Sequence, residues 1–211
     1  MKDNFNIFIR SILAGICIGL GGAIFIKLGG VIGACMFAFG LLTVVHFKLP
    51  LYTGTAGFIE LNKFKEYERM IIILFGNILG CILLSYMNIK GIDGSLIIQN
   101  RLDTTYLQCL LNAIGCGLIM TLIVQAGRDY KTKFIDKYGN ICTIGRDKNL
   151  LLILFGIPLF ILLGFYHSIA DAFYMMVSPE DLRNLFFGRY WVIVLGNFIG
   201  CNVPRLLKYN I

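Results

Sequence analysis

Charged residues are scarce in this sequence. Asp, Glu, Lys and Arg together make up 15% of its 211 residues, whereas soluble domains average about a quarter. Apolar residues make up 57% and the mean hydropathy is +0.77, so the apolar content is higher than that of an ordinary soluble domain. These values exclude a soluble globular protein and predict a polytopic membrane protein. The length leaves room for about six spans of ~20 residues with short loops.

Metal-binding and disulfide patterns are also missing. The seven cysteines include no pair with Cys-x-x-Cys spacing, and all but one of them lie in apolar stretches. We therefore expect packing cysteines, no disulfides, no metal and no cofactor. The formal net charge of +7 does not indicate a nucleic-acid partner, because the basic residues lie between the apolar stretches, as membrane topology requires.

Six apolar segments predict an all-α membrane protein with six transmembrane helices. They span roughly residues 7–26, 29–47, 70–87, 106–126, 149–177 and 190–207. The second is followed closely by Pro50, Gly54 and Gly57, which disfavour a continuous helix. The fifth contains Pro158 and is interrupted by a polar stretch that begins at His167. Irregular backbone inside a membrane is tolerated only where it is buried in protein or lines a cavity, so these two broken helices mark the expected pathway.

One five-residue pattern occurs twice inside apolar segments. Residues 76–80 read Gly-Asn-Ile-Leu-Gly, residues 196–200 read Gly-Asn-Phe-Ile-Gly, and a cysteine follows each copy. The repetition predicts two similar halves, roughly residues 1–100 and 101–211, in a single transmembrane domain of residues 1–211. Glycines four residues apart let helices approach closely, and Asn77 and Asn197 are expected to hydrogen-bond to the broken segments.

The distribution of lysine and arginine predicts the orientation. With six spans both termini share one side, and that side receives most of the basic residues. The other side receives only Lys27, Lys90, Arg101, Arg183 and Arg189. Positive residues concentrate on the cytoplasmic side of membrane proteins, so both termini are expected to be cytoplasmic.

His167, at the second break, is the main candidate for chemistry. An ionisable residue inside a span suggests function, and histidine changes its charge near neutral pH. Asp171 follows four residues later, so in a helix it would share a face with His167, orient it and stabilise its protonated form. The alternative is that Asp171 ends a helix and faces water. Thr53, at the first break, offers a hydroxyl to a small anion, unless the segment is a simple turn.

Several stretches resemble the motifs of the formate/nitrite transporter family and keep the family's order. They are Phe37–Leu41 with Leu51–Gly54, Leu110–Asn112, Phe165–Ala170 and Leu195–Gly200. The resemblance covers nearly the whole chain. It implies an aquaporin-like fold with a three-plus-three inverted repeat, a homopentamer with one pore per protomer, and a place in the bacterial inner membrane.

The same resemblance implies an outer hydrophobic constriction, an inner one, and polar groups between them. These are, in turn, Phe37 and Phe160; Leu41, Leu51 and Tyr52; and Thr53, Asn112 and His167. A charged formate crosses a dry constriction only at high cost, whereas neutral formic acid crosses it far more easily. In the mechanism usually drawn for the family, the proton reaches the anion at or near His167.

Three departures from the family pattern bear on the substrate. Tyr52 stands where the family usually has Phe, and Asp171 stands where it usually has Asn. Leu96 lies near the position of a family lysine that attracts anions, and the nearest cations are Lys90 and Arg101.

These observations leave two functions open. The first is a channel or proton-coupled transporter for a small monovalent anion or its weak acid, with formate, nitrite and hydrosulfide as candidates. The alternative is a pore of the same fold for water or a small neutral solute. An intramembrane enzyme that uses His167 and Asp171 would lack a nucleophile or a third metal ligand, so no enzyme is expected.

Overall fold

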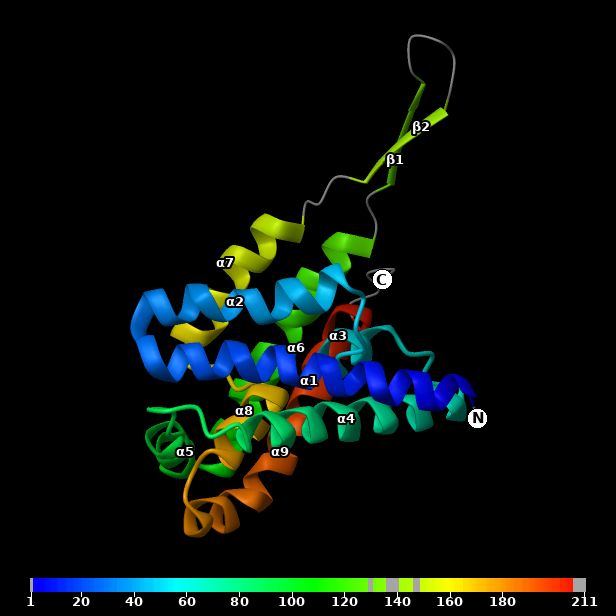
Figure 1. Ribbon diagram of the computed structural model, residues 1–211. Helices are drawn as coiled ribbons and strands as arrows, with labels where there is room; N and C mark the ends of the chain where they lie inside the picture. Colours follow the sequence, from blue (N-terminus) through cyan, green and yellow to red (C-terminus); the bar gives the residue numbers. More distant parts are fainter. Residues whose placement is uncertain (1, 129–130, 136–140, 146–148, 207–211) are drawn as a thin grey trace.

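Helices packed side by side form the body of the molecule (Figure 1). The computed structural model describes residues 2–128, 131–135, 141–145 and 149–206. The longer helices are α1 (Lys2–Leu28), α2 (Gly30–His46), α4 (Phe64–Ser85), α6 (Tyr106–Arg128), α7 (Asn149–Leu162) and α9 (Glu180–Leu206). The shorter ones are α3 (Tyr52–Thr55), the 3-10 helix η1 (Ala56–Phe58), α5 (Ser95–Leu102) and α8 (Ser168–Met176). This is the helical class that the apolar segments predicted.

The helices extend beyond the apolar segments at several ends. Within the described residues, the stretches that are long and apolar enough to cross a membrane are Asp3–Leu28, Phe64–Ser85 and Tyr106–Val124, and α2 and α7 are apolar but shorter. α4 starts before residue 70 and α9 before residue 190. Charged residues occupy the first turns of both helices, so the apolar segments did not include these turns. The number of six spans stays a prediction.

The helices of the two halves make matching contacts. α1 packs against α2 and α4, just as α6 packs against α7 and α9, and α2 meets α7 between the halves. The short helices cross over: α8 packs against α4 of the first half, and α3 packs against α9 of the second. The pattern supports the predicted duplication, and the inverted relation of the halves stays a prediction.

A two-stranded antiparallel hairpin lies between α6 and α7. β1 (Lys131–Ile135) pairs with β2 (Ile141–Gly145), with Lys131 opposite Gly145 and Ile135 opposite Ile141. The hairpin projects away from the helices (Figure 1). This connection contains no long apolar segment, so no structure was expected for it from the sequence.

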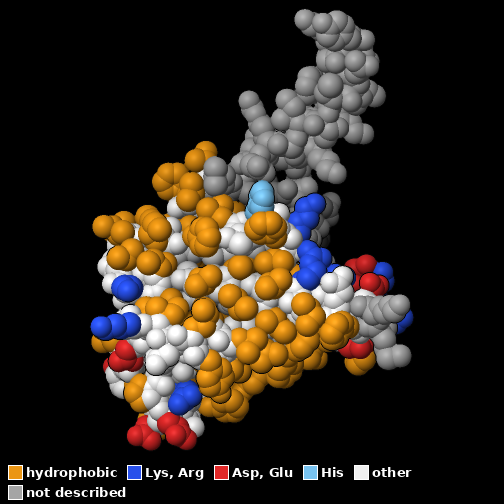
Figure 2. Space-filling model, in the orientation of Figure 1, with side chains coloured by type: hydrophobic (Ala, Val, Ile, Leu, Met, Phe, Trp, Pro, Cys, Tyr) orange, Lys and Arg blue, Asp and Glu red, His pale blue; other side chains and the backbone are white. Residues whose placement is uncertain are grey.

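Hydrophobic side chains cover much of the outer surface. In Figure 2 they fill the middle of the visible face, and charged side chains lie toward its edges. Phe39, Phe155 and Leu195 are each more than half exposed. Large apolar patches of this kind are rare on soluble monomers, so the surface suits lipid or further copies of the chain.

Glycines bring the helices into backbone contact at corresponding places in the two halves. A Cβ atom at any of four glycines would collide with a backbone carbonyl oxygen of a neighbouring helix. The pairs are Gly15 with Asn77, Gly80 with Ile12, Gly117 with Asn197, and Gly200 with Ile114. A carbonyl in a helix cannot rotate aside, so only glycine fits at these positions.

Replacing Gly80 by alanine tests this close packing. We expect Gly80→Ala to lower stability by about 1–3 kcal/mol, the usual cost of overpacking, and so to lower the thermal unfolding midpoint in detergent. Gly188→Ala is the control, because its Cβ would meet nothing nearer than the Tyr106 hydroxyl at 3.7 Å. Equal midpoints for the two variants would contradict the proposed contact.

Candidate functional site

Two breaks in the helices define the candidate site. α2 ends at His46 and α3 begins at Tyr52, while α7 ends at Leu162 and α8 begins at Ser168. Pro50 lacks an N–H in the first break, and Gly164 has a φ of 72° in the second, a value that favours glycine. Pro158, in contrast, lies inside α7. Both breaks leave backbone polar groups without helical partners.

Asn77 of α4 satisfies the first break. Its Oδ1 accepts a hydrogen bond from Tyr52 N at 2.9 Å, and its Nδ2 donates to Pro50 O at 3.0 Å. The same Nδ2 donates to Ser11 O of α1 at 2.8 Å. One buried amide therefore holds the residues on both sides of Leu51 and ties them to α1.

Asn197 of α9 makes the same three contacts with the second break. Its Oδ1 accepts from Ser168 N at 2.7 Å, and its Nδ2 donates to Tyr166 O and to Ala113 O, both at 2.8 Å. The clamped residue between Tyr166 and Ser168 is His167. The two amides contact the broken segments as sequence analysis expected, and His167 occupies the place that Leu51 has in the other half.

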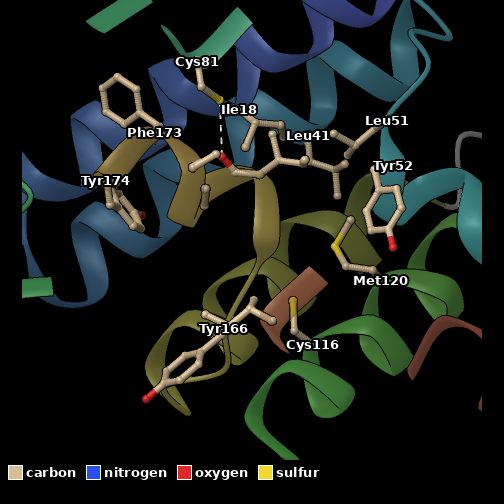
Figure 3. Close-up of a cluster of buried hydrophobic side chains, with 14 of the residues drawn as sticks. Ile18, Leu41, Leu51, Tyr52, Cys81, Cys116, Met120, Tyr166, Phe173 and Tyr174 are labelled. Carbon is tan, nitrogen blue, oxygen red and sulfur yellow. Dashed lines mark hydrogen bonds between the residues drawn. The ribbon is translucent and has the colours of Figure 1, made fainter. Parts of the chain in front are cut away.

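The cysteines that follow the two asparagines connect the halves. Cys81 Sγ donates to Ile169 O of α8, and Cys201 Sγ donates to Thr53 O of α3, each at 3.3 Å. The dashed line at Cys81 in Figure 3 marks the first of these contacts. Each repeated segment thus holds the break of its own half through Asn and the short helix of the other half through Cys.

His167 and Thr53 meet at the centre of this arrangement. Nε2 of His167 lies 2.9 Å from Thr53 Oγ1, and both side chains are buried. Nδ1 of His167 accepts from Ala170 N at 3.2 Å and so caps α8. An atom that accepts an N–H must offer a lone pair, so the neutral imidazole carries its proton on Nε2, which donates to Thr53.

Two sets of apolar side chains accompany this polar pair. The rings of Phe37 and Phe160 meet edge-on with centroids 6.3 Å apart, and Phe160 stacks on His167 at 5.9 Å. The other set comprises Leu41, Leu51 and Tyr52, which Figure 3 shows close together, and all three are at most 3% exposed. The Tyr52 hydroxyl donates to Val194 O at 3.1 Å.

A cavity of about 160 Å³ opens beside the Phe37–Phe160 pair. We call it the vestibule. Its lining includes both phenylalanines, His167, Tyr174 and Arg101, with further residues from α5 and α7. Among the described residues no cluster of His, Cys, Asp or Glu could hold a metal ion. Beside apolar and aromatic side chains, a ligand would meet here the His167 imidazole, the Arg101 guanidinium and the Asn100 amide.

Asp171 neither pairs with His167 nor faces water, which were the two expectations from the sequence. Its side chain is fully buried, so it does not face water. It does not pair with His167 either: its Oδ1 accepts from Arg101 Nε at 2.6 Å. Because His167 is the cap that precedes α8, with φ −105° and ψ 112°, the helical spacing that predicted a shared face does not apply.

Asn112 is half-buried on α6, and its backbone carbonyl accepts from Tyr166 N at 3.3 Å. It is not among the residues that line the vestibule, and its place in the pathway stays a prediction. Arg101 was expected only as one of the two cations nearest the missing family lysine and was not placed among the site residues, because the eight-residue helix α5 is too short to stand out in the sequence.

A family model for formate/nitrite transporters matches residues 2–209. The chain belongs to the formate/nitrite transporter family. The uncharacterized transporter YrhG of Bacillus subtilis (strain 168) is 26% identical in a 199-position alignment that covers 86% of this chain and 66% of that protein. This chain thus spans just under two thirds of that relative's length.

Solved structures confirm the fold class. A pentameric formate channel with formate bound has a TM-score of 0.80 at 21% identity, with 99% of this chain and 96% of that chain covered. An FNT family ion channel has the same TM-score at 17% identity, with 99% and 90% covered. As a formate/nitrite transporter family member, the chain is an integral membrane protein of a transporter family rather than an enzyme.

Replacing Asn197 tests its clamp. We expect Asn197→Leu to leave Ser168 N and Tyr166 O unpaired in a buried place, at a cost of about 1–3 kcal/mol each, and to lower the unfolding midpoint in detergent strongly. Asn100→Leu, on the exposed surface of α5, is the control and should leave the midpoint unchanged. If both variants melt together with the unmodified protein, the clamp is not needed for stability.

Proposed function

We propose that this protein is a channel or proton-coupled transporter for a small monovalent anion or its weak acid. The observation that carries the proposal is the buried hydrogen bond between His167 and Thr53 amid buried apolar side chains. Formate, nitrite and hydrosulfide are the candidate substrates. The pathway comprises Phe37, Phe160, Leu41, Leu51, Tyr52, Thr53, Asn112 and His167.

The chemistry follows from the low polarity of the constrictions. An ion loses most of its hydration between Phe37 and Phe160, at a cost of several kcal/mol, whereas the neutral acid loses little. His167 offers an N–H at Nε2 and Thr53 a hydroxyl, so together they can hydrogen-bond the anion near the centre. A neutral imidazole is too weak an acid to give up this proton, so transfer requires that the ring first take a second proton from water on Nδ1. The imidazolium then gives one proton to the anion and returns to the neutral imidazole.

The alternative of a neutral-solute pore loses the features that favoured it. The hydroxyl of Tyr52 is bonded to Val194 O and adds no free polar group to the inner constriction. The carboxylate of Asp171 is paired with Arg101, which also supplies a cation to the vestibule. The pentameric formate channel with formate bound has a similar fold, which supports an anion as the substrate of this protein.

The assembly and its placement are part of the proposal. The pentameric state of the related formate channel supports a homopentamer of this chain, whose large apolar surface would contact lipid and the neighbouring copies. The excess of Lys and Arg on one side favours cytoplasmic termini, and the family resemblance favours the bacterial inner membrane. Residues 1–211 would act as one transmembrane domain.

The test is uptake into liposomes that hold the purified protein, across a pH gradient, with formate, nitrite and hydrosulfide. We expect anion uptake by liposomes with the wild-type protein to exceed uptake by empty liposomes. The uptake rate of His167→Asn should be about tenfold lower than that of the wild type, because asparagine can still cap α8 but cannot donate a proton. His167→Ala should lose as much and also fold less well.

The outcomes distinguish the proposed anion pathway from the alternative pore for neutral solutes. Anion uptake that is equal in wild type and His167→Asn would overturn the role of the imidazole. Uptake of water or neutral solutes without any of the three anions would support the alternative pore.

A further inference from the structure

Arg101 is held in one orientation at the edge of the vestibule. Its Nε donates to Asp171 at 2.6 Å, and its guanidinium carbon lies 4.3 Å from the centre of the Tyr166 ring, within cation–π range. Tyr174 lies on a further side at 6.0 Å. The arginine side chain is only 13% exposed. Its position is therefore built by α8 and the second break, not by a flexible loop.

The helix that carries Arg101 is fixed at both ends. At its start, Asp93 Oδ1 accepts from Ser95 N at 2.9 Å, and the hydrogen bonds from Ser95 hold the pKa of Asp93 below its usual value, so this contact persists at neutral pH. At its end, Nη1 of Arg189 donates to Thr104 O. The first contact orders the start of α5, and the second ties the residues after it to α9.

One edge of the guanidinium has no hydrogen-bond partner in the part of the chain that the structure describes. Among the described residues, the Arg101 side chain donates a hydrogen bond only through Nε, which leaves the Nη1 and Nη2 groups unbonded. The same side chain lines the vestibule with Phe37, Phe160 and His167. Two parallel N–H groups in this fork match the two oxygens of a carboxylate or nitrite, and a single-centre anion can use only part of them.

Asp171 keeps the fork available. The carboxylate is fully buried and Arg101 is its ion-pair partner, so the pair is costly to separate. Its Oδ2 has no hydrogen-bond partner among the described residues. Asp171 therefore holds the Nε end of Arg101 and leaves the opposite edge for a ligand.

We propose that Arg101 is a specificity-determining residue that binds two-oxygen monovalent anions, such as formate and nitrite, through Nη1 and Nη2 next to the Phe37–Phe160 pair. It selects them over single-centre anions such as hydrosulfide. Asp171 is the positioning residue of this site. The inference rests on the proposed function, because it names the class of anion that the pathway admits first.

The deciding variant is Arg101→Lys, which keeps the charge and a partner for Asp171 but loses the fork. Initial uptake rates in liposomes would give apparent KM values for formate, nitrite and hydrosulfide. We expect the values for formate and nitrite to rise about five- to tenfold and that for hydrosulfide to change less than about twofold. Lys90→Gln is the control. It removes an exposed cation that is predicted on the same side of the membrane as Arg101 but does not line the vestibule, so it should leave the ratios of the KM values unchanged.

Asp171→Asn separates selection from simple charge. Asparagine can still accept from Nε, while the local charge becomes more positive by one, so all three KM values should fall together and their ratios should stay as in wild type. Size-exclusion chromatography of each variant checks folding, and KM does not depend on the amount reconstituted.

The results distinguish this site from the proposed function. Equal KM shifts for all three anions in Arg101→Lys would overturn the inference, since charge alone would then explain the effect, and so would unchanged KM values. In both cases wild-type anion uptake would leave the proposed function intact. Absence of anion uptake by the wild type would instead remove the proposed function itself.

Discussion

Two buried amides satisfy the backbone groups that the broken helices expose, and the rest of the structure depends on them. Inside an apolar body no bulk water is available to the N–H and C=O groups around Leu51 and His167. Asn77 and Asn197 each accept one N–H and donate to one C=O of a break, and each also anchors to a neighbouring helix. Because an unpaired buried group costs about 1–3 kcal/mol, the breaks persist only with these partners.

The clamp requires close approach between backbones, which explains the glycines around it. Gly15 faces Asn77 O and Gly117 faces Asn197 O, so any side chain there would push the asparagine helix away from its break. The arrangement is duplicated, but the clamped residues are not alike. One half holds the apolar Leu51 and the other holds the ionisable His167, so a common scaffold positions two chemically different side chains.

Sequence reasoning succeeded where a local pattern carried the information. The repeated Gly-Asn pattern and the positions of the breaks could be read directly, since a proline or a polar stretch inside an apolar segment is visible without a structure. The role of Arg101 could not, because its partner Asp171 is 70 residues away and the pairing depends on how α5 docks. The expected pairing of Asp171 with His167 failed for a physical reason: the residue before a helix does not follow helical spacing.

A buried carboxylate four residues after the central histidine would by itself repel anions from the pathway. The ion pair with Arg101 removes that objection, because at a 2.6 Å separation the two charges form a dipole rather than a net negative centre. The positive end of this dipole belongs to the residue that lines the vestibule, while the negative end is fully buried behind it on α8. An anion that enters the vestibule is nearer to the guanidinium than to the carboxylate. The departure from the family's usual asparagine therefore does not oppose anion entry, since it fixes the cation on which entry would depend.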